Sequence, residues 1–146
     1  MTAERSLISS AAFLFGKLGQ FVTQRFAEQI APLGLRPRHC GVLALLKDDH
    51  PSQLAIAKSL GVSNSVVVNM LDELEDLGAV RRVRETGDRR RHRVEITDHG
   101  RTLLKKATRL ANKLDEELLS PLTAGQVAQL RDSLRALSAG HGLPGG

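Results

Sequence analysis

Aromatic residues are scarce in this chain of 146 residues, which contains no tryptophan, no tyrosine and four phenylalanines. The phenylalanines are Phe13, Phe15, Phe21 and Phe26, all within one segment near the N-terminus. Proteins that bind single-stranded nucleic acids stack the bases on exposed aromatic side chains. The sequence offers no such platform elsewhere, which argues against single-stranded RNA or DNA as a ligand.

Cysteine and long apolar runs are lacking as well. Cys40 is the single cysteine, which excludes an intrachain disulfide. Charged residues interrupt every apolar stretch before it reaches the roughly 20 residues needed to cross a bilayer, so we expect no membrane segment. The N-terminus lacks the basic start, apolar run and cleavage site of a secretion signal. We therefore expect a cytoplasmic protein.

Patterns typical of catalysis or metal binding are also missing. The sequence contains no nucleophile elbow, no phosphate-binding loop and no carboxylate pair in a defined context, so we predict neither an enzyme nor a cofactor. Residue types that bind metals occur at His39, Cys40, Asp48, Asp49 and His50. They do not show the paired spacing of zinc sites, and no metal site is predicted.

Positive charge is the property present in excess. The arginines between residues 81 and 93 are Arg81, Arg82, Arg84, Arg89, Arg90, Arg91 and Arg93. Against Glu85 and Asp88 they leave an excess of +5, which equals the net charge of the whole chain. So dense a cluster repels itself unless a polyanion neutralises it, and a nucleic acid backbone is the commonest such partner. A merely solvated basic hairpin is the alternative.

Apolar residues recur at three- and four-residue steps in the first half of the chain, which is typical of amphipathic helices. They predict a long first helix that stops near Pro32 and Gly34, and a second helix beyond Pro37. Because the first helix is too long for one compact domain to cover, its phenylalanines are expected to pack against other helices or a second copy of the chain. The wall of a ligand pocket is the alternative.

Two shorter helices are predicted over residues 52–60 and 63–77. The residues of the first that we expect to face inward are Leu54, Ile56, Ala57 and Leu60. The spacing of Ala57, Gly61 and Val67 is typical of two helices that cross at a sharp angle, since the small residue permits close approach and the glycine allows the turn. A helix-turn-helix is the favoured interpretation, and an ordinary helical hairpin is the alternative.

The second of these helices has the features of a recognition helix. Ser63 can cap it by accepting a hydrogen bond from a backbone N–H group. Its solvent side shows short side chains able to meet base edges in a major groove, namely Asn64, Ser65, Val68 and Asn69. The helix has no lysine or arginine, and its acids are Asp72, Glu73, Glu75 and Asp76. Its C-terminal half must therefore face away from phosphate.

After Gly78 the pattern changes to short alternation around a turn at residues 86–88. The alternating apolar residues are Val80, Val83, Val94 and Ile96. They predict an arginine-rich β-hairpin after the recognition helix. A helix-turn-helix followed by such a hairpin makes a winged helix, so duplex DNA is the expected partner. Asp88 subtracts charge, which makes sense if its carboxylate holds a guanidinium in one pose. The expected DNA contacts are Ser63, Asn64, Ser65, Asn69, Arg82, Arg84, Asp88, Arg89, Arg90 and Arg91.

Three short motifs lie in and around this hairpin. Asp88-Arg89-Arg90 is followed, after five residues, by Ile96-Thr97. The segment Leu71-Asp72-Glu73-Leu74-Glu75-Asp76-Leu77-Gly78 precedes the wing, and Gly100 opens the next helix. These motifs resemble those of the MarR family of bacterial transcription regulators, whose wing signature the first of them matches, and the resemblance covers nearly the whole chain. It implies that Asp88 positions a guanidinium and that Arg90 enters the minor groove.

The same resemblance implies a mainly α fold with a small β-hairpin wing, and a homodimer with interlocked terminal helices that binds a palindromic operator. The expected divisions are an N-terminal dimerisation helix (1–34), a winged helix-turn-helix domain (35–98), C-terminal dimerisation helices (99–138) and a disordered glycine-rich tail (139–146). Thr97 and the capping box Thr123-x-x-Gln126 are expected to begin the last two helices. A monomer whose terminal helices complete its own core is the alternative.

Members of the family commonly bind small, often anionic aromatic ligands between the dimerisation helices and the winged domain. The resemblance thus implies a repressor relieved by such an effector. The candidate lining residues are Phe13, Lys17, Arg38, His39 and Cys40. Solvation of Arg38 and an internal hydrogen bond of His39 are the alternatives. Two other functions stay open: a thiol redox switch at Cys40, which is otherwise a small buried hydrophobe, and a winged-helix module that binds proteins.

Overall fold

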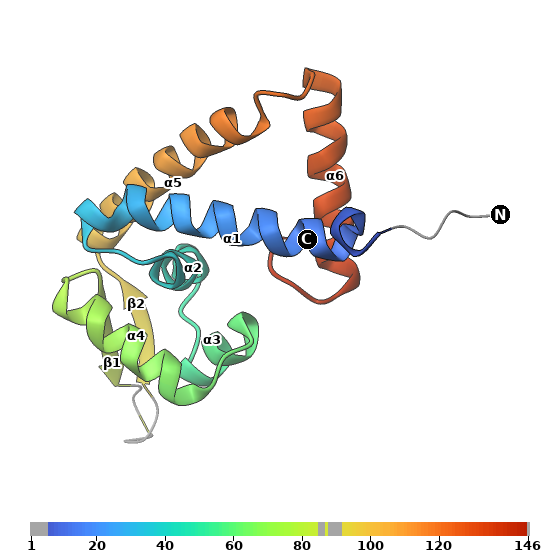
Figure 1. Cartoon of the computed structure of the whole chain (residues 1–146). Coiled ribbons are helices and arrows are strands. Elements are labelled where there is room, and N and C mark those ends of the chain that lie inside the picture. Colours follow the sequence, from blue (N-terminus) through green and yellow to red (C-terminus); the bar gives the residue numbers. More distant parts are fainter. Residues whose placement is uncertain (1–5, 85–86, 88–91, 146) are drawn as a thin grey trace.

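The computed structural model describes residues 6–84, 87 and 92–145 of the chain (Figure 1). The elements are η1 (Leu7–Ser9), α1 (Ala11–Ile30), η2 (Ala31–Leu33), α2 (Pro37–Leu46), α3 (Gln53–Leu60), α4 (Asn64–Asp76), β1 (Val80–Arg84), β2 (His92–Ile96), α5 (Asp98–Leu119) and α6 (Ala124–Gly140). The mainly helical architecture with one antiparallel hairpin confirms the fold class predicted from the sequence.

Side-chain caps begin most of the helices. The hydroxyl of Ser63 accepts a hydrogen bond from the Val66 N–H at the start of α4, and that of Thr97 accepts one from the Gly100 N–H at the start of α5. Thr123 and Gln126 form the predicted capping box of α6. Each cap satisfies backbone donors that the first turn of a helix leaves unpaired, so the predicted starts of these helices are confirmed.

Glycine is required at two junctions. Gly61 ends α3 in the left-handed conformation with φ 64°, which glycine adopts without steric cost. At Gly100 a Cβ atom would overlap the carbonyl oxygen of Ala79. The base of the hairpin and the first turn of α5 therefore pack backbone against backbone.

The apolar core lies in and around the winged part of the chain (residues 35–98), and it also includes Ile30 of α1 and Leu103 and Ala107 of α5. Its fully buried side chains are those of Ile30, Leu35, Val42, Leu43, Leu46, Ile56, Val67, Leu71, Leu74 and Val94. Leu54 was expected inside but is 71% exposed. Ile56, Ala57 and Leu60 share one face of α3, whereas Leu54 lies two residues before Ile56 and so roughly 160° around the helix. The inward assignment of Leu54 is wrong for that reason.

Helices α3 and α4 are consecutive and partly apolar, which raises the question of a membrane span. Among the described residues, no single helix is both long enough and apolar enough to span a membrane. Joined together, α3 and α4 reach that length and hydropathy, but they are bent by 111°. Their apolar side chains Ile56, Val67 and Leu71 lie in the core.

The hairpin is short and in register. Val80 pairs with Ile96 at its base and Arg84 pairs with His92 at its outer end. An isolated bridge between Ser52 and Arg93 joins the segment before α3 to β2. The predicted hairpin is confirmed in residues 80–84 and 92–96.

The terminal helices extend from this winged part. Figure 1 shows α1 crossing the molecule and α5 rising from β2 to the turn that precedes α6. None of the residues of α6 is buried. The glycine-rich tail was expected to begin at residue 139, but α6 continues through Gly140 and is closed by a hydrogen bond from the Leu143 N–H to the Ser138 carbonyl. The residues after the helix satisfy its last carbonyls, which the composition alone did not indicate.

Candidate nucleic-acid interface

The first turns of α4 present polar side chains to solvent. Asn64, Ser65 and Asn69 are exposed, and Val68 is half-buried. The opposite side of α4 packs into the core through Val67, Met70, Leu71 and Leu74. The exposed side chains surround the end of α4 where the N–H groups and the helix dipole favour an anion. This end can therefore approach a phosphate backbone.

Arg82 on β1 is held by its own chain. Its Nη2 lies 2.8 Å from Asp72 Oδ1 and its Nη1 lies 2.7 Å from Glu75 Oε2. Its Nε donates to Gln53 Oε1 at 3.1 Å, and Nη2 also donates to the carbonyl of Val68 at 3.2 Å. All three guanidinium nitrogens therefore have partners on α3 or α4. Arg82 was predicted to contact DNA, and its observed contacts join the wing to the helix-turn-helix.

Two further arginines of the hairpin share one acid. Arg81 Nε donates to Glu95 Oε2 at 3.0 Å, and Arg93 Nη2 lies 3.1 Å from Glu95 Oε1. The hydrogen bond from Arg81, together with both positive charges, lowers the pKa of Glu95. Much of the positive charge in the two strands is thus balanced locally. Charge available to a polyanion must come from elsewhere on the wing.

The remaining predicted wing contacts lie toward the end of the hairpin. Arg84 is exposed at the outer end of β1. Asp88, Arg89, Arg90 and Arg91 lie outside the described residues, so the roles predicted for them remain predictions.

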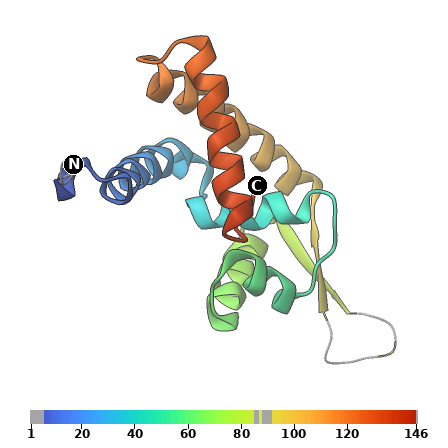
Figure 2. The same ribbon diagram turned by 90° about the vertical axis from the view of Figure 1, so that its right-hand side faces the viewer.

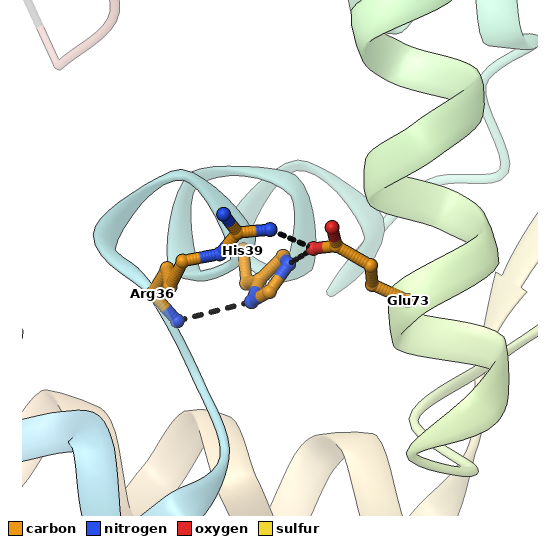
Figure 3. A network of polar contacts seen from close by, with 3 residues as sticks. All are labelled: Arg36, His39 and Glu73. Carbon is orange, nitrogen blue, oxygen red and sulfur yellow. Dashed lines mark hydrogen bonds and ion pairs between the residues drawn. The ribbon is translucent and has the colours of Figure 1, made fainter.

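A polar network that sequence reasoning missed joins α4 to the start of α2 (Figure 3). The backbone N–H of Arg36 donates to His39 Nδ1 at 3.0 Å, so the ring proton sits on Nε2, which donates to Glu73 Oε2 at 2.6 Å. The Arg36 guanidinium pairs with the same carboxylate oxygen. The hydrogen bond from Arg36 and then that from His39 lower the pKa of Glu73. The buried His39 is thus satisfied internally, as one of the two sequence interpretations expected.

The same residues form one side of a crevice between α1, α2 and α4. The crevice has a volume of about 450 Å³ and its lining includes Thr23, Arg36, Arg38, His39, Asn69 and Glu73. Two of the five predicted ligand residues, Arg38 and His39, therefore lie at it. Phe13 and Lys17 lie elsewhere along α1, where Lys17 Nζ sits 5.7 Å from the centroid of the Phe13 ring.

Cys40, the remaining candidate ligand residue, is half-buried against the core. Burial raises the pKa of its thiol to about 11. Within the described residues, no three His, Cys, Asp or Glu side chains are grouped so that they could hold a metal ion. The thiol therefore sits in an environment that favours its neutral form.

A helix-turn-helix followed by an arginine-bearing hairpin defines a winged-helix protein of the DNA-binding class. A family model described as MarR family matches residues 33–91, which include α2, α3, α4 and β1. This segment therefore resembles the MarR family, and the solved structures that match the chain include MarR-family transcription regulators.

Solved structures of this family superpose on nearly the whole chain. A MarR-family transcriptional regulator from Rhodococcus sp. RHA1 is 27% identical, with a TM-score of 0.83 over 92% of this chain and 96% of that one. CouR from Rhodococcus jostii RHA1, bound to p-coumaroyl-CoA, is 28% identical, with a TM-score of 0.77 and the same coverage. The Mycobacterium tuberculosis protein Rv2887, in complex with salicylic acid, is 26% identical, with a TM-score of 0.73 over 88% of this chain and 96% of that one.

Proposed function

We propose that the chain binds a palindromic DNA operator as a homodimer and represses transcription until an effector binds. The observation that carries this proposal is that the start of α4 and the outer end of the hairpin lie at the same end of the molecule (Figures 1 and 2). One duplex can meet both. We place the protein in the cytoplasm because its DNA target lies there.

On the duplex, α4 and the wing have different tasks. Asn64, Ser65 and Asn69 read base edges in the major groove, where short amide and hydroxyl side chains form specific hydrogen bonds. Arg84 and the arginines at positions 89–91 supply the charge that meets the backbone and minor groove. Arg90 is the groove-entering arginine, which a narrow A·T-rich minor groove attracts. Asp88 fixes the pose of a neighbouring guanidinium.

The experiment that tests DNA reading is selection of bound sequences from a random duplex library, followed by anisotropy titration of the winning duplex. We expect a palindrome with half-sites about one or two helical turns apart. Arg90→Ala should weaken binding to it by about 1–3 kcal/mol. A library without any enriched sequence would favour a winged helix that binds proteins instead.

Homodimerisation is supported by the apolar residues that the terminal segments expose. The large apolar side chains exposed there are Leu7, Ile8, Leu14, Phe15, Leu18, Phe21, Leu122, Leu134, Leu137 and Leu143. Contiguous apolar surface on a protein marks an interaction site. In a symmetric dimer, the terminal helices of each chain cover those of the other chain. Such a dimer presents two winged parts to one operator.

The effector site is the crevice between α1, α2 and α4. The relatives above bind p-coumaroyl-CoA and salicylic acid, which are anions with an aromatic ring. In this chain an anion entering the crevice would compete with Glu73 for Arg36 and His39, and so loosen α4 from α2. Salicylate titrated into the protein–operator complex is the test, and release of the duplex is the expected result.

A further inference from the structure

A second hollow lies between α2 and α5, apart from the crevice and from the predicted DNA contacts. Its volume is about 530 Å³, and its lining residues are Ala44, Lys47, Arg101, Leu104, Lys105, Thr108 and Arg109. Four of these side chains are cations and none is an acid. We call it the α2–α5 groove.

The cations of the groove are placed where they destabilise the isolated helix. Arg101 lies in the first turn of α5, where the helix dipole disfavours positive charge. Arg101, Lys105 and Arg109 follow one another at steps of four residues, and like charges at this spacing repel. The repulsion among these cations lowers the stability of the free protein. A bound anion would neutralise the cations, which explains why they are placed together.

The duplex that α4 and the wing bind is not this anion. Among the described residues, none of β1 or β2 lines the groove, whose α5 side begins at Arg101, five residues after Ile96 at the base of the hairpin; Arg84 and His92 form the outer end. Four steps along a strand separate the two ends by about 13 Å. A duplex at the outer end therefore leaves the groove open.

The shape of the groove indicates what kind of anion fits. Eight residues of helix place the backbones of Arg101 and Arg109 about 12 Å apart, a row longer than one phosphate group. A hydrogen bond from Arg101 Nη1 to the Lys47 carbonyl at 2.9 Å draws the two helices together. Ala44 and Leu104 add apolar surface between the cations. A ligand with several charges and an organic part uses all of these features.

We propose that the α2–α5 groove binds a small organic anion that carries two or more phosphate groups. The phosphates lie along Arg101, Lys105 and Arg109, and Lys47 closes the row from α2. The organic part covers Leu104 and Ala44. The site is independent of the effector crevice, so the protein can respond to two different small molecules.

Isothermal titration calorimetry of the full chain, at constant ionic strength, tests this site with ADP and sodium tripolyphosphate as probes. We expect both probes to bind and the double variant Lys105→Ala/Arg109→Ala to bind them at least about tenfold more weakly, because it loses two charge-assisted contacts. The matched control is Lys106→Ala/Lys113→Ala, which removes the same charge from α5 at exposed positions outside the groove. The control should bind the probes as the unchanged protein does.

Two results would overturn the site: no binding of either probe by the unchanged protein, or an equal loss in both double variants, which would show attraction by overall charge only. All four substituted side chains are partly or fully exposed, and circular dichroism checks that both variants fold. The calorimetry contains no DNA, so its outcome is separate from that of the operator selection.

Discussion

Experiments can decide whether Arg82 acts as a structural residue or as a phosphate ligand. Because its guanidinium bridges Asp72, Glu75 and Gln53, Arg82→Ala should lower the free energy of unfolding by about 1–2 kcal/mol, an amount reduced by the partial exposure of both acids. Operator affinity should fall because α4 and the wing would no longer be held in one relative position. The salt dependence of binding should stay the same, since no phosphate contact is removed.

Arg84→Ala is the matched control for this prediction. It removes the same charge from the exposed outer end of β1 and should flatten the slope of log K against log salt by about 0.9, with little change in stability. Urea unfolding and anisotropy over a range of salt concentrations measure both quantities. A flattened slope together with unchanged stability in Arg82→Ala would make Arg82 a phosphate ligand.

Cys40 is predicted to be unreactive in the folded protein. With a pKa of about 11, a fraction on the order of 10⁻⁴ of the thiol is ionised at pH 7, and the thiolate is the reactive form. Iodoacetamide should therefore alkylate the native protein much more slowly than the protein in guanidinium chloride, as followed by mass spectrometry. Equal rates in the two conditions, or peroxide oxidation of Cys40 accompanied by loss of DNA binding, would support the thiol switch instead.

At the scale of elements, the acids of α4 bear on its proposed role as a recognition helix, because the helix has no lysine or arginine to offset their charge. Asp72 and Glu75 face β1 through Arg82, while Glu73 faces α2 through Arg36 and His39. These carboxylates are thus paired with cations on two sides of the helix. They hold α4 in place, while its polar first turns stay exposed.

The contact between α2 and α4 makes a prediction about pH. The pKa of Glu73 is lowered in the folded protein from an ordinary value of 4.5, so its carboxylate stabilises the fold above about pH 4.5, and this contribution is lost as the pH falls through the lowered pKa. Glu73→Gln should therefore be less stable than the unchanged protein at pH 7, and the difference should shrink on acidification below pH 4.5. Urea unfolding of both proteins from pH 3 to 7 measures it.

The control for the α2–α4 contact is Glu116→Gln, an exposed glutamate on α5 for which no contact with Arg36 or His39 exists among the described residues. Its stability should follow that of the unchanged protein at every pH. A stability difference for Glu73→Gln that stays constant down to pH 3 would mean that the carboxylate charge is not what stabilises the contact.

Local signals account for the parts of the fold that were predicted from the sequence. At three helix starts, a side-chain oxygen accepts a hydrogen bond from the backbone N–H three residues later, and such short-range bonds can be recognised in sequence. The capping residues are Ser63, Thr97 and Thr123. The pairing of Arg36 with Glu73 joins residues 37 positions apart. No periodicity marks it, because packing of α2 against α4 alone brings the two side chains together. The same holds for Arg82 and Gln53, which are 29 positions apart.

At the scale of the whole molecule, α6 and much of α1 have little to pack against within the chain. The apolar side chains that they expose are arranged along helices, as in an interface, and not scattered singly. Figure 2 shows α6 standing in front of the body that α1, α2 and α5 form. A dimer would supply the missing contacts and would also couple the positions of the two winged parts.

Leu18→Asp is predicted to separate the dimer into monomers. Leu18 is 54% exposed in the middle of α1, beside Phe21, which is 52% exposed, and a carboxylate buried there in an apolar contact would lose its hydration without gaining a partner. Analytical ultracentrifugation should give the mass of a dimer for the unchanged protein and of a monomer for the variant. The melting temperature should rise with protein concentration only in the unchanged protein.

The matched control is Leu54→Asp, which makes the same change on α3 at a side chain that is 71% exposed, and it should remain a dimer. Operator binding adds a second measurement, because a monomer binds one half-site and a dimer binds two. The monomeric variant should lose most of the affinity for the palindrome. It should keep the weak affinity for a single half-site. If Leu18→Asp sediments as a dimer, or the unchanged protein as a monomer, the apolar face of α1 has another partner.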